Sequence, residues 1–167
     1  MDEAGFWTLV ESAHDQSGGD MDRKSKIIAA LIGKLSKADA TDFQKHFDRK
    51  LHDAYDYRLW GAAYVINGGC GDDAFYDFRV SLISRGKAAY EKALADPDSL
   101  AEDEPDEIAW FYEGYQYAVG DAVERVVGER VRGEPHPREP TGEHFDDETV
   151  FKRYPKLSTM MGYEDQL

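Results

Sequence analysis

The residues best able to do chemistry lie between positions 60 and 79 of the sequence. A glycine-rich turn at residues 67–71 contains the single cysteine, and two adjacent carboxylates and an arginine follow it. This stretch therefore combines a thiol, two hard oxygen ligands and a cation around one turn, with aromatic rings just before it. We take it as the candidate ligand or partner site, with the members Trp60, Tyr64, Asn67, Cys70, Asp72, Asp73 and Arg79.

The glycine turn does not match a phosphate-binding loop. It lacks both the Lys-Ser/Thr pair of a P-loop and the G-x-G-x-x-G spacing, and Asp72 and Asp73 would place negative charge where the phosphate should lie. These carboxylates could instead hold Mg²⁺ or Ca²⁺ together with Asp77 and Glu113, but such ions need several oxygens that converge from different directions. Adjacent helix residues do not face one another, so we favour capping of a helix by Asp72 and expect no metal.

Nucleophilic and zinc chemistry find little support. The two acids beside Cys70 oppose a low thiol pKa, so this residue is predicted to be a small buried part of the turn. The five histidines lack zinc-ligand spacing. A partly buried Arg79 would need a partner, and a salt bridge to Asp73 or Asp77 would make it a fold-specifying group first and a ligand clamp second. We therefore predict no catalytic residue and no cofactor.

Several amphipathic rings could line a groove for a ligand or a partner. Their helical spacing makes packing in the core and at its edge the better prediction. These rings belong to Trp60, Tyr64, Trp110, Tyr112 and Tyr117.

The composition excludes several classes of protein. The 167 residues include 20 Lys+Arg against 34 Asp+Glu, and the formal charge of −14 disfavours binding to nucleic acids and anionic membranes. No apolar run approaches the ~20 residues that cross a bilayer, and the acidic N-terminus is unlike a signal peptide. A single cysteine forms no intramolecular disulfide, so a cytoplasmic location is predicted. Seven of the acids lie between Asp96 and Glu107, so much of the charge belongs to one solvated connection.

Helical periodicity dominates the first half of the chain. One stripe runs from Phe6 to Ala13, and a second from Ile27 to Leu35, after Asp20 as a cap and with Lys24 on a solvated position. Ser36 resembles a capping residue and starts a third helix, which carries an apolar face from position 43 to position 55. Residues 59–66 are apolar all round, and two adjacent alanines favour a buried helix over a buried strand.

The next segments are also predicted to be helical. Asp72 is the expected N-cap of a helix with apolar residues at positions 75, 78, 82 and 83, and residues 87–95 form a short helix that stops at Asp96-Pro97. The acidic stretch that follows is a loop or short turn. Pro105 suits the first turn of one further helix, whose stripe runs without interruption from Ile108 to Val126.

The chain changes in character after residue 128. Two glycines and three prolines punctuate residues 133–142, which therefore cannot be regular structure, and aromatic residues return between positions 145 and 163. We predict an all-α protein, with one helical domain of six to seven helices at residues 1–128. Residues 129–167 are predicted to be an irregular C-terminal arm that docks on this domain through aromatic anchors, and a disordered tail is the alternative.

Residues 59–100, which contain the segment INGGCGDDAFYDFR at positions 66–79, resemble a bacterial family known as domain of unknown function 4240. The similarity extends to FYEGYQYAVGDAVERVVG at residues 111–128, to residues 6–9 and across the third predicted helix. The resemblance implies one mostly helical domain and no activity. Gly71 stands where the family often has serine, and Ser81 where it often has tryptophan, so an aromatic pocket at position 81 is in doubt.

Three functions remain open at this stage. The first is a non-catalytic cytoplasmic module that binds another protein or a regulatory ligand, which suits an acidic helical domain with an aromatic arm. The second is a small-molecule-binding protein or enzyme that uses Asn67, Asp72, Asp73 and Arg79. The third is an acidic, immunity-type neutraliser of a basic partner, which rests on charge alone.

Overall fold

The computed structural model describes residues 1–103 and 107–167. The protein is 69% helical, and seven helices of the described residues span seven or more positions. This confirms the predicted all-α class, and the described part of the chain contains only one isolated β-bridge, between Asp56 and Thr141. The elements are α1 (Glu3–Ser17), α2 (Met21–Ile32), α3 (Lys37–Asp53), α4 (Tyr57–Asn67), α5 (Asp72–Ile83), α6 (Lys87–Ala95), the 3-10 helix η1 (Pro97–Glu102), α7 (Glu107–Trp110), α8 (Gly114–Val127), α9 (Val150–Arg153), α10 (Pro155–Met160) and the 3-10 helix η2 (Glu164–Gln166).

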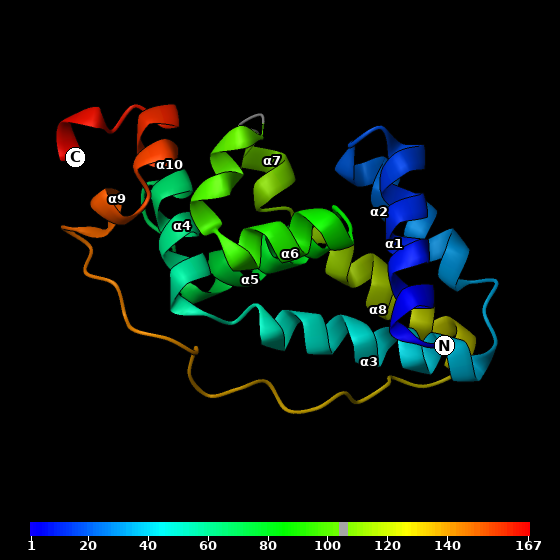
Figure 1. The fold of residues 1–167 in the computed structure, drawn as a ribbon. Coiled ribbons are helices and arrows are strands. Elements are labelled where there is room, and N and C mark those ends of the chain that lie inside the picture. The colour runs from blue at the N-terminus through cyan, green and yellow to red at the C-terminus, as the bar shows by residue number, and fades with distance from the viewer. Residues whose placement is uncertain (104–106) are drawn as a thin grey trace.

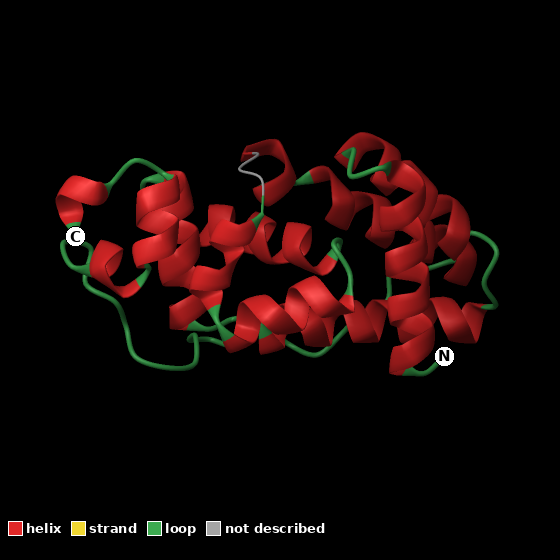
Figure 2. Ribbon diagram, turned by 45° about the horizontal axis from the view of Figure 1, so that its top comes forward, coloured by secondary structure: helices red, strands yellow, loops and turns green. Residues whose placement is uncertain are grey.

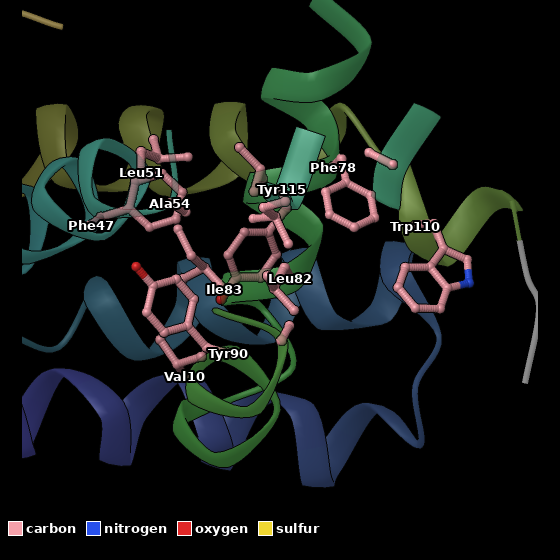
Figure 3. Close-up of a cluster of buried hydrophobic side chains, with 14 of the residues drawn as sticks. Val10, Phe47, Leu51, Ala54, Phe78, Leu82, Ile83, Tyr90, Trp110 and Tyr115 are labelled. Carbon is pink, nitrogen blue, oxygen red and sulfur yellow. The ribbon is translucent and has the colours of Figure 1, made fainter. Parts of the chain in front are cut away.

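The helices form an elongated body with α3 along one side (Figures 1 and 2). At the N-terminal end α2 packs against α1 and α8, and α3 packs against α8 and α5. At the other end α10 packs against α4, α9 and η1. One hydrophobic core links both ends. Figure 3 shows its centre, where Phe47 of α3 lies beside Tyr115 of α8, and Phe78 of α5 stacks on Trp110 with ring centroids 5.7 Å apart.

Capping residues set the starts of α2 and α3 where the sequence predicts them. The Asp20 carboxylate accepts a hydrogen bond from the Arg23 N–H (2.7 Å), and the Ser36 hydroxyl accepts one from the Asp39 N–H (3.1 Å). Residues 59–66 lie in α4, which confirms a helix there, and α6 spans the predicted residues 87–95. Local signals suffice for these elements because a cap and an apolar stripe both act within one or two turns.

Three predictions about the helices are wrong. The N-cap of α5 is Gly71, and Asp72 is the first helical residue, because the backbone of Gly71 is still extended (φ −75°, ψ 176°). Lys24 is not solvated but buried, since α2 is enclosed by both α1 and α8. The acidic stretch is not wholly a solvated loop, since it begins with η1, in which Leu100 is buried.

The stripe from Ile108 to Val126 is also not one helix, because α7 ends at Trp110 and α8 begins at Gly114. Between them the Tyr112 N–H donates to the Ser81 hydroxyl (2.9 Å), which replaces a bond within a helix. A Cβ atom at Gly114 would lie 2.8 Å from the Tyr112 ring, so a side chain at this position would require the ring to move. The prediction for Pro105 concerns a position outside the described residues.

Residues 150–160 of the arm pack firmly on the helical body. Val150, Tyr154 and Leu157 are buried. The Tyr154 hydroxyl donates to the Arg58 carbonyl, and the Asp98 carboxylate accepts hydrogen bonds from the N–H groups of Lys156 (3.2 Å) and Leu157 (2.9 Å). The arm is thus anchored to α4 and η1 at its far end.

Replacing Gly61 by alanine is expected to loosen this anchor. The new Cβ atom would lie 2.7 Å from the Tyr154 hydroxyl oxygen and 2.9 Å from its ring, and the buried ring has little room to move. We expect the free energy of unfolding to fall by about 1–3 kcal/mol, measured by urea denaturation, with faster hydrogen exchange of residues 150–160. Gly120→Ala is the matched control, because nothing lies within 4 Å of its Cβ. A G61A variant as stable as this control would contradict the close approach.

Candidate functional site

The glycine turn is held by two of the candidate residues. The Trp60 indole N–H donates to the Cys70 carbonyl (2.8 Å), and the Asn67 side-chain amide donates to the Gly69 carbonyl (2.9 Å). Gly68 and Gly69 have φ angles of 64° and 127°, which side-chain-bearing residues rarely adopt. Trp60 and Asn67 therefore stabilise the conformation of the turn.

Cys70 is poorly suited to act as a nucleophile. Its side chain is partly buried, and burial raises the thiol pKa to about 12, with a smaller contribution from the nearby Asp72 carboxylate. Only the thiolate is a strong nucleophile. The thiol therefore stays protonated at neutral pH.

The candidate carboxylates lie at the exposed N-terminus of α5. Asp72 and Asp73 are both exposed, and Asp72 accepts a long hydrogen bond from the Tyr55 hydroxyl (3.4 Å). One turn further, partial burial raises the pKa of Asp77 to about 6, and repulsion from Glu113 and Asp73 adds to this. Among the described side chains, those of residues 1–103 and 109–167, no three Asp, Glu, His or Cys residues form a group that could hold a metal ion.

Arg79 is the buried centre of the region, with an exposed fraction of 1%. Its guanidinium carbon lies 4.6 Å from the Tyr55 ring centroid, 4.9 Å from that of Phe75 and 5.4 Å from that of Tyr76. Its Nη1 donates to the Leu51 carbonyl (2.7 Å), which belongs to the last turn of α3, and its Nε donates to the Phe75 carbonyl (3.4 Å). Burial lowers its pKa to about 10, so it remains a cation at neutral pH.

The predicted salt bridge to Asp73 or Asp77 does not form in the described part of the chain. Both carboxylates lie on α5 itself, and the Arg79 side chain points instead to the end of α3. Carbonyl dipoles and ring faces take the place of a carboxylate, which is a favourable environment for a guanidinium.

A histidine from the arm completes the surroundings of Arg79. Arg79 Nη1 lies 3.2 Å from His136 Nε2, and His136 Nδ1 lies 2.8 Å from the Pro137 carbonyl. These contacts assign the proton to Nδ1, which donates to the carbonyl, while Nε2 accepts from the arginine. The His136 ring also meets the Tyr55 ring edge to face, with centroids 4.6 Å apart. We call the set Arg79, Tyr55, Phe75, Tyr76 and His136 the Arg79 centre.

The structure gathers only part of the predicted site. Trp60 stacks on Phe75 with centroids 4.8 Å apart, so Trp60, Asp72 and Arg79 all border the same rings. Tyr64 faces another way and contacts Phe145 and Phe151 of the arm. Among the other amphipathic rings Trp110 is buried, and Tyr117 is 56% exposed.

His136 and Tyr55 were not predicted as site residues. His136 is 57 positions from Arg79, and its surroundings in the sequence are prolines and charged residues. The sequence signal near it was the run of prolines, which predicts an irregular segment but not its place in the fold.

The arm runs along α3 towards α4 as an extended segment (Figure 1). We call residues 133–145 the strap. Beyond His136 the Thr141 N–H donates to the Tyr55 carbonyl (2.9 Å), and the Tyr57 N–H donates to the Thr141 carbonyl (2.9 Å). The Thr141 hydroxyl donates to Asp56 (2.9 Å), and the His144 ring lies 4.7 Å from that of Tyr57. Most strap side chains remain exposed.

Comparison with known proteins gives one match. The model of a family described as protein of unknown function (DUF4240) matches residues 1–125. No curated protein and no solved structure matches the chain. The matched residues contain every candidate site residue from Trp60 to Arg79, whereas the strap lies beyond them.

Within the described residues, no helix has both the length and the apolar character needed to cross a membrane.

Proposed function

This chain belongs to the family described as protein of unknown function (DUF4240), and since that description gives no activity, we propose a function from the geometry: the protein is a non-catalytic module that binds an extended, proline-containing segment of another protein. The binding surface consists of the end of α3, the start of α4 and the Arg79 centre without His136, which belongs to the strap. We propose further that the module acts in the cytoplasm, because its single cysteine has no intramolecular partner.

The observation that carries the proposal is the strap, which lies on this surface as a bound peptide would. Thr141 of the strap forms two backbone hydrogen bonds with this surface. Its N–H donates to the Tyr55 carbonyl, and its carbonyl accepts from the Tyr57 N–H. Backbone pairing of this kind is a general way to hold an extended peptide, and ring contacts beside it provide selectivity. The bonds at His136 and Thr141 then act as the two points of recognition.

The prolines of the strap and the aromatic rings of the surface fit the binding of a proline-rich peptide. The strap contains prolines at positions 135, 137 and 140, in the order P-H-P-R-E-P. Proline-rich segments hold an extended conformation at low entropic cost and commonly bind surfaces lined by aromatic rings. Rings of His52, Tyr55 and Tyr57 line the path of the strap here.

A catalytic role has less support. The Cys70 thiol is protonated at neutral pH, Asp73 is exposed, and the exposed Asn67 amide is bonded to the Gly69 carbonyl. Arg79 itself is engaged by carbonyls and rings and has no adjacent acid or base of the kind that proton transfer requires, apart from a histidine that already uses both nitrogens. We therefore keep a protein segment as the partner.

The experiment replaces the strap and measures binding of a separate peptide. In the full chain, residues 133–142 are changed to an equally long Gly/Ser segment, which leaves α9 and α10 anchored. A fluorescent peptide with the sequence of residues 133–145 is then titrated. We expect at least tenfold tighter binding to the changed chain than to the natural one, because the attached strap competes at a high effective concentration.

The controls test recognition itself. A peptide with alanine at the three prolines and at the positions of His136 and Thr141 should bind at least tenfold more weakly. Tyr117→Ala, which removes an exposed ring on α8, should leave peptide binding unchanged. Equal binding of both peptides to the changed chain would reject the proposal.

A further inference from the structure

A concave region that shares no lining residue with the strap surface lies near the end of α1. It is a cleft of about 440 Å³ between the end of α1, the start of α2, the residues after α5 and α7. This volume lies in the range of small-molecule sites. The residues that line it include His14, Lys24, Arg85, Asp103 and Trp110.

Lys24 lines the cleft and is the least expected residue in it. Only 1% of its side chain is exposed, and its Nζ donates to the Ser84 hydroxyl (3.2 Å). The Ser84 hydroxyl in turn donates to the Ser81 carbonyl (2.7 Å), so its own proton is used. Among the side chains of residues 1–103 and 109–167, no carboxylate lies within ion-pair distance of Lys24 Nζ.

Further donors face the same cleft. The Arg85 guanidinium lies over the Trp110 ring, 4.9 Å from its centroid, and pairs with Asp103 at 2.9 Å. His14 Nδ1 is buried and has no hydrogen-bond partner in the described part of the chain. Asp20 also lines the cleft, but its carboxylate is engaged as the cap of α2. The cleft is therefore lined by one cation without a described counter-charge and by a histidine whose buried Nδ1 has no described partner.

Burial of a charge is costly unless an opposite charge or several hydrogen bonds accompany it. One neutral hydroxyl does not meet that requirement for an ammonium group with three donors. A buried polar atom without a partner has a similar cost, and such atoms in native structures commonly mark a site that something else completes. The surroundings of both groups lower their pKa values: burial and Arg85 act on Lys24, and burial and Lys24 act on His14.

We propose that this cleft binds a small oxyanion, the carboxylate or phosphate group of a small molecule. Lys24 Nζ supplies the charge, and His14 Nδ1 and the Arg85 guanidinium donate further hydrogen bonds to the same group. The Trp110 ring forms the apolar wall for the remainder of the ligand. The site is separate from the strap surface and does not depend on the function proposed for it.

The test measures thermal unfolding of the full chain in sodium phosphate, sodium acetate and sodium chloride at equal ionic strength. We expect phosphate or acetate to raise Tm above its value in chloride by about 5 °C at saturation, and the stronger of the two anions identifies the group. Isothermal titration with that anion should show a single site.

Variants separate a site from the general stabilising effect of such salts. Lys24→Met should abolish the difference between the anions, and Lys26→Met, which removes an exposed lysine from the same helix, should retain it. His14→Gln should weaken anion binding in titration by several-fold, and it serves as a second variant if K24M folds poorly. Equal Tm values in all three salts, or an equal anion effect in K24M and K26M, would overturn the proposal.

Discussion

The Arg79→Ala variant is expected to have a free energy of unfolding lower than that of the natural protein by about 3–4 kcal/mol. Arg79 is fully buried, and its removal leaves a cavity between the Tyr55, Phe75 and Tyr76 rings. It also leaves the Leu51 carbonyl, at the end of α3, without its donor. Urea denaturation followed by circular dichroism measures the difference.

Two further arginine variants decide how this loss arises. Arg125→Ala removes an exposed arginine from α8 and should change the stability by less than about 0.5 kcal/mol. Arg79→Lys keeps the charge but lacks the planar group that both stacks on rings and donates to two carbonyls, so we expect it to recover less than half of the loss. If R79A were as stable as R125A, Arg79 would have no structural role, and its burial would require another explanation.

The second large effect is a gain in stability. Lys24→Met should raise the free energy of unfolding at pH 7 by up to about 3 kcal/mol, because methionine fills a similar volume without a buried charge. Burial lowers the pKa of Lys24 from 10.5 to about 8, and this difference corresponds to about 3 kcal/mol in favour of the unfolded state when the lysine is protonated. The lost bond to Ser84 reduces the gain.

The gain should depend on pH in a defined direction. Between pH 8 and pH 10.5 the unfolded chain binds more protons at Lys24 than the folded chain, so the stability of the natural protein rises with pH. K24M lacks this group, and its advantage should therefore shrink across this range. Tyrosines that titrate at high pH are present in both proteins and cancel in the difference. Urea denaturation at pH 7 and pH 10 measures it, with K26M as the control.

An unchanged difference between the natural protein and K24M at the two pH values would show that Lys24 has an ordinary pKa. The expected penalty also bears on the cleft at the end of α1. A buried lysine that lowers stability is a feature that functional sites commonly contain, since stability and binding place different demands on the same residue.

The sequence alone determined the local structure of most of the chain. Apolar stripes and capping residues predicted the first six long helices, because both signals act between residues three or four positions apart. The stretch at residues 59–100 predicted membership of the family, which the match to residues 1–125 confirms. The Ser81 hydroxyl accepts the Tyr112 N–H at the break between α7 and α8, a contact that the sequence did not predict.

Only the tertiary structure decided what the polar residues do. The sequence placed Lys24 in solvent and Arg79 beside a carboxylate on its own helix, but α1 and α8 enclose the first, and the second reaches the end of α3 and a histidine of the arm. The contact between Arg79 and His136 joins residues 57 positions apart, and the bond from Lys24 to Ser84 joins residues 60 positions apart. Periodicity specifies which face of a helix is apolar, whereas the partner of a buried cation is fixed by which helices pack against it, and a single sequence contains no local signal for that choice.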